Sequence, residues 1–191
     1  MKEAPRNTHR RVLAAVIVLV VALIVILAAF VLWRQPATTT SGTNVGDNPP
    51  DFTLPDTNNI QWNLQSHIRN GKPILLEFVH PQASFCQLMG PVLNQVQMNY
   101  SGAIEIVSIA VTFELQGFTN PPDQISTSQF KSALGSMWTY LYEEHGTQVK
   151  ELYNIRGLPT LFLLGKDGRI AWMNAGWVAY QALKEQIESV L

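Results

Sequence analysis

The sequence contains a single cysteine, Cys86, among 191 residues. One thiol excludes any disulfide within the chain and any zinc site built from several thiolates. Charged residues are also scarce, at 14% of the total, and the segment from residue 47 to the C-terminus carries 8 basic and 13 acidic side chains. Because no basic stripe remains to contact phosphates, we expect no nucleic-acid partner.

Charge is missing altogether from residues 12–33, which read VLAAVIVLVVALIVILAAFVLW. As a helix this run would be roughly 33 Å long, which is enough to cross a hydrocarbon core. The preceding residues 1–11 carry four basic side chains, Lys2, Arg6, Arg10 and Arg11. The sequence therefore predicts a signal anchor at 12–33 that crosses the cell membrane once. The positive-inside rule predicts that the N-terminus is cytoplasmic and that the rest of the chain is extracytoplasmic.

A cleaved signal peptide is the alternative for this apolar run. Signal peptides have an apolar region of about 7–15 residues followed by a small-x-small cleavage site. Here the run is longer, and residues 30–35 offer no such site. Residues 34–50 are rich in Thr, Ser, Gly, Asn and Pro, so we expect a flexible tether there.

The rest of the chain, residues 51–191, alternates between strand and helix patterns, and we expect one domain. Strands are predicted at 52–54, 60–62, 73–79 and 104–111, and a hairpin at 160–164 and 169–173. Helices are predicted at 64–69, 84–99, 126–144 (capped by Ser126 or Thr127), 147–153 and 178–191. This order indicates an α/β fold with a mixed central sheet flanked by helices.

Four blocks of sequence carry a resemblance to a known family: GDNPPDFTLPD, GKPILLEFVHP, CQLMGPVL and YNIRGLPTLFLLGKDGRI. Residues 46–191 resemble the membrane-anchored thioredoxin-like proteins of the TlpA/ResA type, which are thiol–disulfide oxidoreductases. The resemblance implies a thioredoxin-like fold. It also implies a cis peptide bond before Pro159, with the backbone at Leu158 and Pro159 beside the redox centre and paired with an incoming thiol substrate. A trans proline opening an edge strand is the alternative.

In that family the central strand leads into a Cys-x-x-Cys motif at the N-terminus of a helix, and the first thiol is the nucleophile. Counting forward from Phe78 places the first cysteine position at Ala83. Counting back from Pro91 places the second at Cys86. The motif therefore reads Ala83-Ser84-Phe85-Cys86, and the chain cannot cycle between dithiol and disulfide on its own.

Three hypotheses remain for this site. In the first, Cys86 is a working thiol that forms mixed disulfides or a sulfenate, and in the second it is an inert buried residue. In the third, the groove around Ala83, Cys86 and Pro159 binds a substrate or partner without redox turnover. Our leading hypothesis is cell-envelope redox chemistry through Cys86, with thiol-containing envelope proteins or small thiols as partners. Glu77, inside an apolar strand, is the candidate acid/base, and a solvated carboxyl at the strand margin is the alternative. We expect no cofactor and no metal.

Two enzyme classes compete with this assignment. Residues 80–86 resemble a one-cysteine peroxidase loop, Pro-x-x-x-Thr-x-x-Cys, although the spacing is two residues short and Arg156 is the nearest basic residue. Copper delivery would need His80 or His145 beside Cys86. A single thiol with scattered histidines is weak evidence for such a copper site. Four aromatic residues precede Pro159 and either pack in the core or wall a groove: Trp138, Tyr140, Tyr142 and Tyr153.

Overall fold

The computed structural model describes residues 16–27, 41–113, 121–143 and 149–191. The chain divides into two units, Met1–Thr39 and Thr40–Leu191. In the first unit, residues 16–27 form a helix in which every side chain is exposed. Among the described residues, no helix is both long enough and apolar enough to cross a membrane. The other residues of the predicted anchor, 12–15 and 28–33, lie outside the described part of the chain, as do residues 1–11.

A five-stranded mixed sheet forms the centre of the second unit, in the order β5-β4-β3-β6-β7. Strands β3, β4 and β5 run parallel, and β6 and β7 run antiparallel to their neighbours. This confirms the predicted mixed sheet of a thioredoxin-like fold. The strand bounds are Ile74–Val79 (β3), Glu105–Ala110 (β4), Thr139–Tyr142 (β5), Thr160–Leu164 (β6) and Ile170–Ala175 (β7), and a separate hairpin is made by Thr53–Pro55 (β1) and Gln61–Asn63 (β2).

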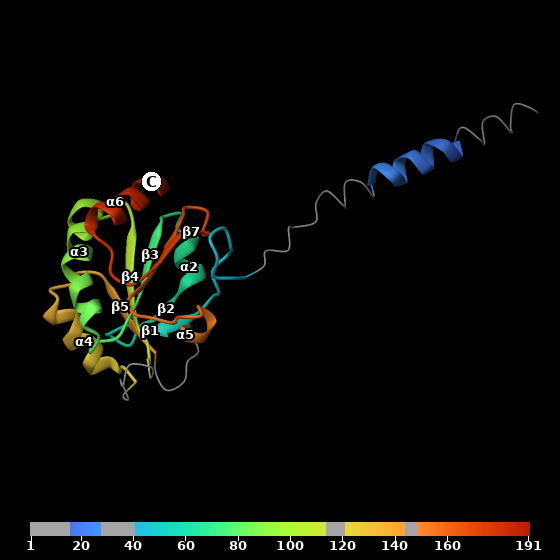
Figure 1. The fold of residues 1–191 in the computed structure, drawn as a ribbon. Coiled ribbons are helices and arrows are strands. Elements are labelled where there is room, and N and C mark those ends of the chain that lie inside the picture. Colours follow the sequence, from blue (N-terminus) through green and yellow to red (C-terminus); the bar gives the residue numbers. More distant parts are fainter. Residues whose placement is uncertain (1–15, 28–40, 114–120, 144–148) are drawn as a thin grey trace, which may run out of the picture. The chain divides into compact units, whose positions relative to one another are not determined.

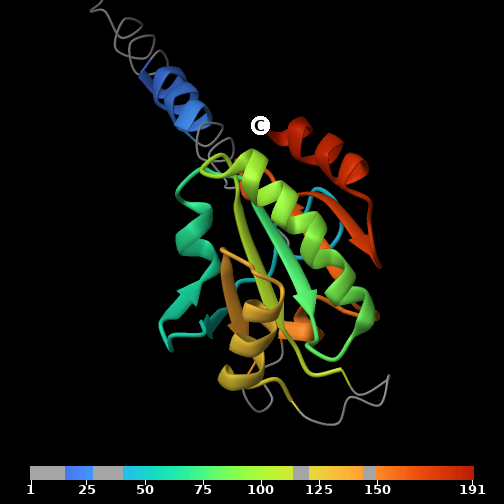
Figure 2. The ribbon, with the colours of Figure 1, turned by 90° about the vertical axis from the view of Figure 1, so that its left-hand side faces the viewer.

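Helices cover both faces of this sheet. Their bounds are Leu64–Ile68 (α2), Ser84–Tyr100 (α3), Gln124–Ala133 (α4), Val149–Leu152 (α5) and Tyr180–Val190 (α6). The connections β3-α3-β4 and β4-α4-β5 step in the same direction along the sheet, so right-handed crossovers place α3 and α4 on one face. Figures 1 and 2 show α3, α4 and α6 on that face and α2 and α5 toward the other.

The predicted helix at 126–144 is wrong in its second half. Helix α4 begins after Asp123, whose carboxylate accepts the Ser126 N–H in a capping box, and it ends at Ala133. Gly135 follows with φ of 64°, the left-handed conformation that terminates helices. Residues Thr139–Tyr142 then form β5 instead of continuing the helix. The cap is therefore Asp123, and Ser126 is its partner.

Part of the predicted tether belongs to the second unit. Among residues 41–50, the Gly46 N–H donates to the Ile170 carbonyl at 2.8 Å, and the Ile170 N–H donates to the Asp47 carbonyl at 3.0 Å. The Tyr153 hydroxyl donates to the Pro50 carbonyl at 2.8 Å. The packed domain therefore begins before residue 51, and residues 34–40 lie outside the described chain.

One edge of the sheet gathers the residues singled out by the sequence. All six residues of β3 are buried, as expected of a central strand covered on both faces. Because β3, β4 and β5 are parallel, their carboxyl ends meet at this edge. Antiparallel β6 pairs Thr160 with Phe78, so Leu158 and Pro159 arrive at the edge where β3 ends. The loop from β3 to α3 lies there as well.

Candidate functional site

The loop after β3 delivers the Ala83–Cys86 motif to the start of α3. The Ala83 N–H donates to the His80 carbonyl at 3.0 Å, and the Cys86 N–H donates to the Ala83 carbonyl at 3.0 Å. Ala83 is the N-cap residue of α3, and its side chain offers no capping hydrogen bond. The position of the family's nucleophile is thus occupied by a methyl group that is 4% exposed.

Cys86 lies in the first turn of α3 and is only 1% exposed. Burial raises the pKa of its thiol to about 12, and the nearby Glu77 carboxyl raises it further, while a backbone hydrogen bond with His80 acts in the opposite direction. At pH 7 a thiol with that pKa is ionised in roughly 1 of 10⁵ molecules. The thiolate is the reactive form, so the site disfavours a nucleophilic Cys86.

Glu77 faces the same region from β3 and is 2% exposed. Burial raises the pKa of this carboxyl to about 8, and the hydrogen bond from Ser108 partly offsets the shift. The Ser108 hydroxyl donates to Glu77 Oε2 at 2.5 Å, and Trp138 Nε1 donates to Ser108 Oγ at 2.9 Å. The structure brings Glu77 and Cys86 close enough to interact electrostatically. The raised pKa keeps Glu77 mainly neutral at pH 7, and the carboxyl is held by Ser108, which Trp138 holds in turn.

Ser108 and Trp138 are the members of this network that the sequence reasoning missed. The signal was present, because Ser108 is the one hydroxyl inside the otherwise apolar run from Ile106 to Val111. A buried polar side chain needs a partner, which in this chain is Glu77 on the neighbouring strand.

The peptide bond between Leu158 and Pro159 is cis, as the resemblance implied. Leu158 is 6% exposed, and the carbonyl of Pro159 accepts the Gly176 N–H at 2.7 Å. Both residues thus lie at the edge of the sheet that carries Ala83 and Cys86. Their assignment to substrate binding stays a prediction.

A groove runs between the Ala83–Cys86 loop and α4, and we call it the α4 groove. Its volume is about 540 Å³, within the range of ligand-binding clefts. Its lining is Pro81, Gln82, Gln87, Ser126, Gln129, Phe130, Ala133 and Leu134. None of these residues is charged, and three are glutamines. Phe85 and Leu88, which follow Ala83 on α3, are 61% and 56% exposed.

The residues proposed for rival activities are placed differently. Among the described residues, no group of three His, Cys, Asp or Glu side chains could hold a metal ion. His80 is 2% exposed, its Nδ1 accepts the Gln82 N–H at 3.2 Å, and His145 lies outside the described chain. Arg156 is exposed and donates to Asn154 Oδ1 at 2.8 Å. All four aromatic residues before Pro159 are core residues, at most 5% exposed: Trp138, Tyr140, Tyr142 and Tyr153.

Comparison with known proteins agrees with this architecture. The model of the AhpC/TSA family matches residues 45–173. The thiol-disulfide oxidoreductase ResA of Geobacillus thermodenitrificans (strain NG80-2) is 23% identical over 188 residues, which cover 97% of this chain and 98% of the relative.

Two solved structures share the fold. A thiol:disulfide interchange protein of the thioredoxin family from Chlorobium tepidum TLS gives a TM-score of 0.62 at 16% identity, covering 82% of this chain and 99% of that chain. The exposed lipoprotein thioredoxin Etrx1 from Streptococcus pneumoniae strain TIGR4 gives 0.60 at 17% identity, covering 73% and 99%. Because the family model covers more than half of the residues, the chain belongs to the AhpC/TSA family, and it is a thioredoxin-fold protein similar to thiol-disulfide oxidoreductases of the ResA type.

Proposed function

We propose that this chain is a membrane-tethered, extracytoplasmic thioredoxin-fold protein that binds a partner polypeptide without exchanging disulfides with it. The observation that carries the proposal is the pair formed by Ala83 and Cys86. Reduction of a disulfide takes two electrons, which a Cys-x-x-Cys motif supplies from two thiols. This chain has one thiol, which is 1% exposed and has a pKa raised to about 12.

The α4 groove supports a polypeptide as the partner. The amide side chains of Gln82, Gln87 and Gln129 can each donate to and accept from a peptide backbone, while Phe130 and Leu134 supply apolar contacts. No charge lines the groove, which favours an uncharged stretch of extended chain over a charged ligand. The exposed side chains of Phe85 and Leu88 would extend the apolar contact along α3.

The tether to the membrane follows from the apolar run at 12–33. Its described part, residues 16–27, is helical and presents only apolar side chains to its surroundings. The four basic residues before the run support a location of the domain on the outer side, by the positive-inside rule. Recovery of the full chain in the membrane fraction after alkaline washing would support this arrangement, and release into the supernatant would contradict it.

Binding is tested with the full chain in detergent micelles and a defined unfolded polypeptide, reduced and carboxamidomethylated ribonuclease A, whose thiols carry uncharged caps and whose basic side chains do not attract an added arginine. Binding measured by fluorescence anisotropy should be saturable. Gln129→Arg places a charge in the α4 groove and should weaken binding about tenfold, equivalent to about 1.4 kcal/mol. Gln181→Arg, an equally exposed glutamine on α6, is the matched control and should leave binding unchanged. Equal affinities of the two variants would contradict the proposed groove.

A single-thiol role of Cys86 is the second candidate. Its support is the position of Cys86 in the first turn of α3, where the helix dipole favours a thiolate. A mixed disulfide with glutathione disulfide would favour this role, and a sulfenate formed rapidly with peroxide would favour a one-cysteine peroxidase.

A further inference from the structure

A second hollow lies at the edge of the sheet remote from Cys86, and we call it the β4 hollow. It is about 430 Å³ in volume, and its lining includes His67, Lys72, Gln97, Ile104, Glu105 and Trp138. Glu105 pairs with Ile74 at the start of β3, whereas the Ala83–Cys86 loop follows Val79 at the end of that strand. Five strand steps separate the two ends, which is roughly 17 Å.

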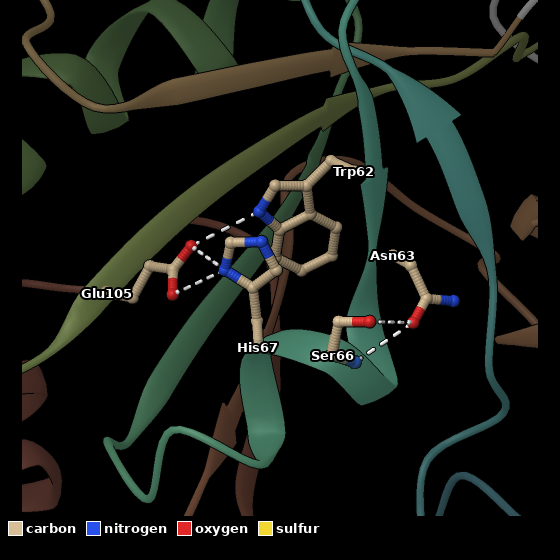
Figure 3. A network of polar contacts seen from close by, with 5 residues as sticks. All are labelled: Trp62, Asn63, Ser66, His67 and Glu105. Atoms are coloured by element: carbon tan, nitrogen blue, oxygen red, sulfur yellow. Dashed lines mark hydrogen bonds and ion pairs between the residues drawn. The ribbon is translucent and has the colours of Figure 1, made fainter.

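Figure 3 shows how the wall of the β4 hollow is fixed. The His67 ring stacks on Trp62 with ring centroids 4.3 Å apart. His67 Nδ1 lies 2.8 Å and 3.0 Å from the two carboxylate oxygens of Glu105, and Trp62 Nε1 donates to Glu105 Oε1 at 3.2 Å. The side chain of Asn63 accepts the Ser66 N–H at 2.9 Å and so caps the helix that carries His67. The His67 imidazole is therefore held in one orientation by its stack on Trp62 and by its contact with Glu105.

The contact with Glu105 determines which nitrogen of His67 is available to a ligand. A carboxylate accepts hydrogen bonds, so Nδ1 carries a proton and the second ring nitrogen, Nε2, is left for a ligand.

The remaining polar groups of the β4 hollow are mainly unused donors. Lys72 and the amides of Asn70 and Gln97 line it, and among the described residues none of these three side chains has a polar partner. The one carboxylate of the lining, Glu105, is already engaged by Trp62 and His67. Lys72 is therefore the one charged side chain of the lining without a polar partner among the described residues, and the buried Ile104 and Trp138 form an apolar floor beside it.

The geometry points to a second binding site in the β4 hollow for a small carboxylate that carries an apolar body. The carboxylate is bound by the Lys72 ammonium together with the Asn70 and Gln97 amides, and the apolar body lies against Ile104 and Trp138. This site is separate from the α4 groove and does not depend on the function proposed there.

The test uses butyrate as the probe and butanol, which has the same apolar body without the charge, as the matched ligand. The full chain in detergent micelles is titrated at constant ionic strength, and tryptophan fluorescence is followed because Trp138 lines the β4 hollow and Trp62 contacts His67. Butyrate should give a saturable change and butanol should give none. Calorimetric titration provides a second readout that is independent of the tryptophans.

Lys72→Gln should weaken butyrate binding about tenfold, since it removes the one cation that meets the carboxylate. His67→Phe keeps the aromatic stack on Trp62 but removes the His67 contact with Glu105, and the freed carboxylate should weaken butyrate binding severalfold. The matched control is Lys184→Gln on α6, which should bind butyrate as the wild type does. The inference is overturned if butyrate gives no saturable signal, if butanol binds equally well, or if the two lysine variants have the same affinity.

Discussion

Replacing Glu77 by glutamine should remove a specific dependence of stability on pH. In the folded chain the pKa of Glu77 is raised to about 8 by burial, against an ordinary value of 4.5 when the chain unfolds. The folded state therefore binds this proton more tightly than the unfolded state, so the contribution to stability is full below pH 4.5 and is lost as the pH rises toward 8. Linkage over this range gives a loss of about 2–3 kcal/mol between pH 5 and pH 7.

The assay is urea unfolding of the wild type and Glu77→Gln at pH 5 and pH 7, monitored by circular dichroism. Other titrating groups are shared by the two proteins, so they cancel in the difference between them. The wild type should lose about 2–3 kcal/mol more than the variant between these two pH values. Glutamine also leaves buried amide hydrogens beside Ser108, so the variant is expected to be the less stable protein at pH 5. Parallel pH dependences would refute a neutral buried Glu77.

Four further substitutions test local packing and backbone conformation by chemical denaturation. Cys86→Ala should cost about 1 kcal/mol of stability and leave binding of the unfolded polypeptide unchanged, because the thiol acts as a small buried apolar group. Trp138→Phe should cost about 1 kcal/mol by removing the donor to Ser108, and an unchanged unfolding midpoint would argue against that bond. Gly168→Ala should destabilise by about 2 kcal/mol or more, because φ is 79° and the new Cβ would lie 2.4 Å from Ile68 Cγ2. Gly71→Ala, with φ of 69° and open space, should cost only about 1 kcal/mol.

Much of the fold could be predicted from local patterns. The buried strands around Leu76 and Val107 appear as apolar runs, and the antiparallel pair at the C-terminus is separated by a Gly-Lys-Asp-Gly turn. The strand at Thr139–Tyr142 was missed because it was merged with the preceding helix. Gly135 was the available signal, since a glycine after a helical run frequently adopts the left-handed conformation that ends it.

The candidate site could be predicted only in part. The position of the Ala83-Ser84-Phe85-Cys86 motif at the start of α3 could be predicted, because it depends only on the spacing of nearby residues in the sequence. The partners of Glu77 depend on the register between β3 and β4, which sets Ser108 beside it, and on β5, which brings Trp138. The β4 hollow likewise depends on Glu105 facing Ile74 across that pairing, so His67 looked like an ordinary surface histidine in the sequence.

The most direct test of the central claim is alkylation of Cys86 in the native full chain, followed by intact mass. A thiol that is 1% exposed, with a pKa of about 12, should stay unlabelled by iodoacetamide at pH 7 and react once urea unfolds the domain. In the same experiment Ala83→Cys should label at the new position and reduce insulin disulfides, which the wild type should not do. Rapid labelling of native Cys86, or insulin reduction by the wild type, would contradict a binding protein without disulfide exchange.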